Sequence, residues 1–256
     1  MRDYPLLVLA VSFVLLSLSL WSGATIFKRR AKLDETLRAD FGLVLSAILT
    51  LLGLIIGFSF SMSISRYDQR KNYEEAEANA IGTEYLRVDL LPAADAARLR
   101  TLLENYLDQR ILSYVTRDKR QLSQIDAQTV RLQTDLWSTA RASGAAQPNP
   151  LVALAVAGMN DVLNAQGYTQ AAWRNRIPVS AWVLMAAIAV CSNILVGFGA
   201  RHFGYEAAFL LILPLALSIS FFLIADIESP RGGLIRVNPE NLISLADSLR
   251  AQTAKP

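Results

Sequence analysis

The chain has 256 residues, a formal net charge of +3 at pH 7, 53% apolar residues and 18% charged residues. Soluble domains carry about 25% charged residues, so the deficit of charge argues against an ordinary soluble protein. A single histidine and a single cysteine exclude a disulfide within the chain and leave too few soft ligands for a zinc site.

The first uncharged stretch covers residues 5–27, long enough to cross the roughly 30 Å hydrocarbon core of a bilayer as a helix. Its apolar part is longer than that of a signal peptide, and Asp3 interrupts the positively charged start that a signal requires. We therefore expect a transmembrane helix here. A second span is predicted over residues 43–64, after a basic loop at 28–42.

Two stripes with a four-residue spacing run along the second span. Small residues form one stripe, which favours close approach of another helix in lipid: Gly53, Gly57, Ser61 and Ser65. The adjacent stripe either faces lipid or faces the axis of an oligomer, where rings of apolar side chains would form a constriction: Thr50, Leu54, Phe58 and Met62.

Two further serines in this span have two interpretations. Ser59 and Ser63 share a helix face near Phe58 and Met62, so their hydroxyls could line an anion path. Alternatively, the hydroxyls bond back to the helix backbone or contact neighbouring helices.

The second span continues without proline into a charged segment, so we expect one helix to leave the membrane and enter the polar domain. Its charged residues form either the vestibule of a pore or a solvated helix face with pairs such as Arg70–Glu74; they are Arg66, Arg70, Glu74, Glu77 and Glu84. The three glutamates fall on nearly one face and could alternatively form a cation site. Asn79 and Gly82 interrupt this strong helix pattern and suggest that another helix approaches closely there.

The polar domain, residues 66–178, shows helical periodicity and no alternating strand pattern. Two more spans follow at about 179–200 and 207–226, and a tail covers 228–256. The predicted fold is thus an all-α integral membrane protein with four transmembrane helices in two pairs, at 1–65 and 179–227, and a helical domain between the pairs.

Lysines and arginines near the span ends are slightly more numerous on the side of the termini and polar domain, which favours a cytoplasmic location in a bacterial inner membrane. The dense basic loop at 28–32 argues for the reverse. No nucleophile, base or metal set converges, so we expect no enzyme, metal or cofactor, and nothing indicates nucleic-acid binding.

Four partly overlapping segments resemble a known family. "GFSFSMSISRYDQR" resembles the pore-helix stretch of bestrophin anion channels, and "IADIESPRGG" resembles the bestrophin segment after the fourth span. "RYDQRKNYEEAEANAIGTEYLRVDLLP" together with "ESPRGGLIRV" looks closer still to the bacterial bestrophin-like proteins, over most of the chain.

The resemblance implies a homo-oligomer, a pentamer in bestrophins, whose second spans surround a pore for inorganic ions. By position, the neck residues would be Thr50, Leu54 and Phe58, although Thr50 departs from the large apolar residue of that family. Calcium gating is not supported, because residues 233–236 lack the acidic run of the calcium site. Asp226 and Glu228 remain as an expected helix cap or ion pair near the membrane surface.

The leading hypothesis is an oligomeric channel, embedded in the lipid bilayer, that conducts anions passively. The alternative is a membrane-anchored helical sensor or scaffold that does not conduct. This second hypothesis gains if the polar domain is periplasmic.

Overall fold

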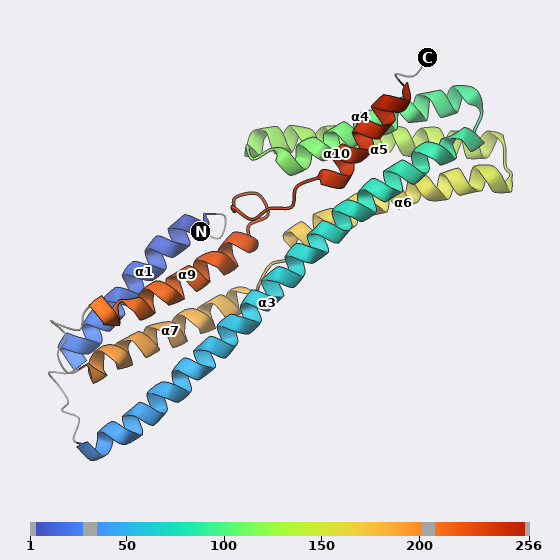
Figure 1. Cartoon of the computed structure of the whole chain (residues 1–256). Helices are drawn as coiled ribbons and strands as arrows, with labels where there is room; N and C mark the ends of the chain where they lie inside the picture. The colour runs from blue at the N-terminus through green and yellow to red at the C-terminus, as the bar shows by residue number, and fades with distance from the viewer. Residues whose placement is uncertain (1–3, 28–34, 201–207, 254–256) are drawn as a thin grey trace. The chain divides into compact units, whose positions relative to one another are not determined.

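The computed structural model describes residues 4–27, 35–200 and 208–253, and every described element is helical (Figure 1). The chain forms two compact units. The membrane unit takes its described residues from 1–65 and 176–236, and the helical unit takes its described residues from 66–175 and 237–256.

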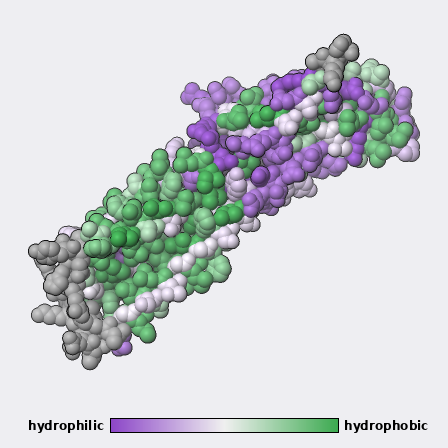
Figure 2. Space-filling model, in the orientation of Figure 1, coloured by the Kyte–Doolittle hydropathy of each residue, from purple (hydrophilic) through white to green (hydrophobic). Residues whose placement is uncertain are grey.

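Four described helical stretches have the length and apolar composition to cross a membrane: Pro5–Ile26, Asp40–Leu90, Pro150–Gly199 and Ala208–Ile227. The four-span prediction and the all-helical prediction are therefore confirmed. In Figure 2, hydrophobic residues concentrate on the membrane unit and hydrophilic residues on the helical unit.

The membrane unit contains α1 (Pro5–Ser22), which continues as a π-helical turn (Gly23–Phe27), the apolar part of α3, α7 (Val179–Gly199) and α9 (Ile212–Ile227). Helix α1 packs on both α7 and α9. The core combines residues of all four helices with one residue that precedes α7: Leu16, Leu52, Ile177, Met185, Ala189, Leu217, Phe221 and Ile224. Pro5 at the first position of α1 and Pro178 before α7 fit helix starts, where no backbone donor is needed.

Helix α3 (Glu35–Arg87) is continuous from the apolar span into the charged segment, and a short 3-10 turn (Val88–Leu90) precedes Pro92. The uninterrupted helix was expected, but it begins at Glu35, inside the stretch predicted as a loop at 28–42. Residues 28–34 of that loop lie outside the described ranges, as does the predicted first residue of the fourth span, residue 207.

The helical unit consists of the polar part of α3, α4 (Ala93–Val115), α5 (Lys119–Ala146), α6 (Pro150–Arg174) and α10 (Glu240–Thr253). Asp118 caps α5 and Asn149 caps α6 through side-chain bonds to backbone N–H groups. Residues 237–253, predicted only as part of a tail, thus supply a helix that packs on α4 and completes the core through Leu242, Ala246 and Leu249.

Candidate functional site

The predicted apolar stripe of α3 is exposed in the described part of the chain. Phe58 is 64% exposed and Leu54 is 54% exposed, and Thr50 and Met62 are exposed as well. The Thr50 hydroxyl donates to the Ser46 carbonyl oxygen at 2.8 Å, which satisfies it within the helix. Large apolar side chains are thus presented outward along one side of this span.

The small-residue stripe beside it is equally open. A Cβ added at Gly53 or Gly57 would have no atom within 4 Å, and Ser61 and Ser65 are exposed. Among the described residues, no helix makes the close packing predicted for this stripe, and the surface is open to contact with another molecule.

Ser59 and Ser63 lie on the opposite, buried side of α3, on the side of Leu52. The Ser63 hydroxyl donates to the Ser59 carbonyl oxygen at 3.0 Å. This geometry matches the interpretation in which these hydroxyls bond to the helix backbone.

A very close helix contact in the membrane unit was not predicted from sequence. A Cβ added at Gly23 would lie under 3.0 Å from the carbonyl oxygen and carbon of Ile194, and one added at Gly197 would meet the carbonyl of Leu20 in the same way. Backbones at the end of α1 and on α7 therefore touch. The two glycines are far apart in the sequence, so no spacing pattern connects them.

Glu77 and Glu74 are buried inside the helical unit, so neither the charged vestibule nor the solvated face predicted for them is correct. Glu77 is 0% exposed and pairs with Arg110 of α4. It also accepts hydrogen bonds from the Thr169 hydroxyl at 3.1 Å and the Tyr114 hydroxyl at 3.4 Å. Side chains of α4 and α6 thus donate to one carboxylate of α3.

Burial and the Glu77 carboxylate both affect the pKa values of its neighbours Arg110 and Tyr114. Burial alone would lower the pKa of Arg110, but the adjacent carboxylate outweighs it and raises that pKa. Burial and the same negative charge raise the pKa of Tyr114. Both side chains therefore stay protonated and serve as fixed donors.

Glu74 attaches the C-terminal helix. Its carboxylate accepts bonds from the Asn241 side chain at 2.6 Å and from the Leu242 backbone N–H at 3.0 Å. Leu242 lies in the first turn of α10, whose unpaired N–H groups and positive dipole end favour an anion. Arg70 is also buried, and Arg66 is partly buried, so the five predicted vestibule residues do not form an exposed cluster.

Glu84, the fifth of the predicted vestibule residues, is a buried acid without hydrogen-bond partners among the described residues. It is 1% exposed, and neither carboxylate oxygen has a hydrogen-bond partner in the part of the chain that the structure describes.

The acidic residues after the fourth span hold backbone segments of the membrane unit. Asp226 accepts from the backbone N–H groups of Leu234 and Ile235 at 2.7 and 2.8 Å. Glu228 accepts from the backbone N–H of Ile177 at 2.6 Å. Asp226 thus closes the turn that follows α9, and Glu228 fastens the segment before α7.

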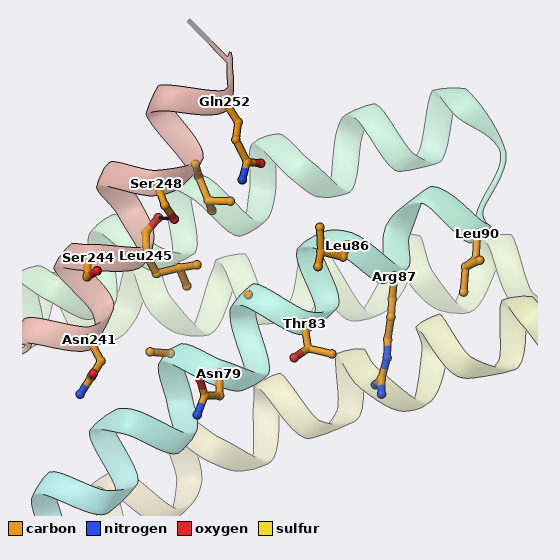
Figure 3. Close-up of a pocket in the computed structure, with 13 residues that line it drawn as sticks. Asn79, Thr83, Leu86, Arg87, Leu90, Asn241, Ser244, Leu245, Ser248 and Gln252 are labelled. Atoms are coloured by element: carbon orange, nitrogen blue, oxygen red, sulfur yellow. Dashed lines mark hydrogen bonds between the residues drawn. The ribbon is translucent and has the colours of Figure 1, made fainter. Parts of the chain in front are cut away.

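A groove of about 660 Å³ lies between α3 and α10 in the helical unit (Figure 3). Its polar lining is largely uncharged, with Arg87 as its cation: Asn79, Thr83, Asn241, Ser244, Ser248 and Gln252. At Gly82, an added Cβ would come within 3.1 Å of the Leu245 side chain. The close helix approach expected at Gly82 is therefore confirmed, and α10 is the helix that approaches.

Within the described ranges, no group of three or more histidine, cysteine, aspartate or glutamate residues could hold a metal ion. The features that remain as functional candidates are the exposed face of α3, the α3–α10 groove and the buried acid Glu84.

Comparison with solved structures shows the fold. A bacterial bestrophin homolog from Klebsiella pneumoniae matches with a TM-score of 0.68 at 16% identity, over 98% of this chain and 99% of that chain. A variant of that homolog with a leucine replaced by threonine matches with a TM-score of 0.63 at 14% identity, over 98% and 99%. A second variant, with a tryptophan replaced by alanine, matches at 0.66 and 15%, over 95% and 94%. No curated protein matches the sequence.

A family model described as the bestrophin-like domain matches residues 10–242. This range includes most of the first apolar helix, the other three in full and nearly all of the helical unit. Together with the apolar helices, the match makes the protein an integral membrane protein, and the chain belongs to the bestrophin-like family.

Proposed function

We propose that the protein is a homo-oligomeric channel that conducts small inorganic anions passively, with the exposed face of α3 lining the pore. The observation that carries this proposal is the outward display of Leu54, Phe58 and Met62 beside an open small-residue stripe. Small residues allow α3 helices of adjacent subunits to approach closely. The adjacent stripe then forms apolar rings around the axis.

The chemistry of the stripe supports conduction controlled by wetting. The pore-facing positions Thr50, Leu54, Phe58 and Met62 bear no charge, so they offer an ion no strong binding site from which escape would be slow. A ring of phenylalanines is a hydrophobic constriction that passes ions when it fills with water. Chloride is the anion to test, because the resemblance is to bestrophin anion channels.

The oligomer number proposed is five, by the same resemblance, and the membrane is the bacterial inner membrane with the termini and helical unit on the cytoplasmic side. A reporter fused to the C-terminus tests this orientation. A periplasmic signal would contradict it.

The test of conduction is chloride flux into liposomes that contain wild-type protein or Phe58→Ala. Truncating the ring should increase flux severalfold, because a wider and less apolar neck wets more readily. Phe209→Ala is the matched control, since Phe209 is 77% exposed in the fourth span, and its flux should equal that of wild type. A monomeric mass together with no anion flux from any variant would refute the channel.

A second candidate function, a sensor or scaffold without conduction, is favoured by the α3–α10 groove, whose uncharged polar lining suits a small hydrogen-bonding ligand. If the protein forms oligomers but carries no chloride flux in liposomes, the sensor or scaffold function would be favoured over the channel.

A further inference from the structure

Glu84 lies on α3 two turns beyond Glu77, and both acids are buried. The two carboxyl groups differ in their hydrogen-bond partners. Glu77 has Arg110, Tyr114 and Thr169 as donors. Both oxygens of Glu84 lack a hydrogen-bond partner among the described residues. Burying a carboxylate without such partners is strongly unfavourable, and proteins avoid this cost by keeping the group protonated.

The Glu84 carboxyl lies close to the backbone of α6, beside the guanidinium of Arg87. The Glu84 carboxyl and the Arg87 guanidinium both converge on Gly158 of α6, where an added Cβ would lie under 3.0 Å from either one. A larger residue at Gly158 would therefore displace one or both of these side chains, and the Glu84 carboxyl lies against the α6 backbone. The contact between α3 and α6 at this level therefore includes the carboxyl itself.

Two charged groups act on Glu84 from the elements packed around it. Arg87 on its own helix favours the ionised form, and Asp161 on α6 opposes it. Arg87 also forms an ion pair with Asp161, with 3.9 Å between Nη1 and Oδ2. Burial is the larger influence and, together with Asp161, outweighs Arg87 and raises the pKa of Glu84 from its ordinary value of 4.5 to about 8.

We propose that Glu84 makes the packing of α3 against α6 dependent on proton concentration: the contact at Gly158 is stable while the carboxyl is protonated and opens when it ionises. This proton-dependent contact lies within the helical unit. It goes beyond the proposed channel activity, because it would open and close whether or not the protein conducts ions.

The sign of the effect follows from linkage. In the open state Glu84 is solvated and has an ordinary pKa, whereas in the packed state it retains its proton up to about pH 8. Between these two values the packed state binds one more proton than the open state. Its stability is therefore fully present below about pH 4.5 and is lost as the pH rises toward 8.

The test is hydrogen exchange of the α6 amides around Gly158, measured on the full-length protein from about pH 5 to about pH 9. Glu84→Gln keeps the shape of the side chain and removes the titration. Dividing the wild-type rate by the variant rate at each pH cancels the chemical pH dependence of exchange. The ratio should rise by about tenfold per pH unit and level off above about pH 8.

Glu75→Gln is the matched control, because Glu75 is an exposed acid on the same helix, and its profile should follow that of wild type. A constant ratio between wild type and Glu84→Gln would overturn the proposal.

Infrared spectroscopy of the wild type gives a second measurement if Glu84→Gln fails to fold. A protonated carboxyl band should be present at about pH 7 and should disappear as the pH passes about 8. Absence of that band at neutral pH would equally overturn the proposal.

Discussion

Glycines in the membrane unit fall into two groups with opposite surroundings. At Gly23 and Gly197, backbone atoms of α7 and of α1 leave no space for a side chain. At Gly53 and Gly57 on α3, an added Cβ would meet nothing within 4 Å. The first pair therefore acts within the folded chain, and the second pair has no partner among the described residues.

This difference separates two uses of small residues in a membrane. Helix association in lipid depends on close packing rather than on the hydrophobic effect. The contact at Gly23 and Gly197 supplies that packing within one chain. On the open face of α3, close packing requires a second molecule, which supports the proposal that α3 lies at the subunit contact. The residues of this face are Gly53, Gly57, Ser61 and Ser65.

The largest expected effect is that of Gly197→Val. Its Cβ would overlap the Leu20 carbonyl, a backbone group that cannot move without displacing α1. Overpacking of this kind costs roughly 3 kcal/mol or more, so the midpoint of thermal unfolding in detergent should fall by roughly 10 °C.

Gly53→Val is the matched control for this change when both midpoints are measured in a detergent that dissociates the oligomer, because within the protomer its side chain enters open space. We expect its unfolding midpoint to stay close to that of wild type. Equal losses for the two variants would show that the two groups of glycines are not distinct.

The second prediction concerns assembly. Gly57→Leu adds a bulky side chain to the open stripe, where the added Cβ meets no described atom of the same chain. The protomer should therefore fold as wild type does, while mass measurement in mild detergent should show a loss of oligomer of about tenfold or more in the association constant.

Ala187→Leu is the control for bulk alone, since Ala187 is an exposed small residue on α7. Its oligomer content should be unchanged. If Gly57→Leu remained fully oligomeric, the proposal that α3 forms the subunit contact would be wrong.

The sequence was sufficient to predict the four apolar helices, the continuity of α3 and the close helix approach at Gly82, because hydropathy and the helical period are local properties. It did not reveal that Glu74 and Glu77 are buried. Their partners, Asn241 and Arg110, lie on helices distant in the chain, and a buried ion pair has the same local pattern as a solvated one.

The contact between Gly23 and Gly197 was missed for the same reason, since it joins residues far apart in the chain. By contrast, the stripes of α3 were visible in the sequence because all their members belong to one helix. The pattern alone could not decide whether the rest of the chain covers them. The exposure of Phe58 and the open space at Gly57 answer that question within the protomer.

The smallest expected effect belongs to Ser63→Ala. Ser63 lies on the buried side of α3, and its hydroxyl is already bonded to the Ser59 carbonyl. Removing it deletes one hydrogen bond and leaves a backbone oxygen that still has its helical donor, so the loss of stability should be about 0.5–1 kcal/mol. Chloride flux in liposomes should stay within about twofold of wild type, in contrast to the increase expected for Phe58→Ala. A severalfold loss of flux with unchanged oligomer content would place these hydroxyls on the ion path after all, and the buried side of α3 would then have to open toward the pore during conduction.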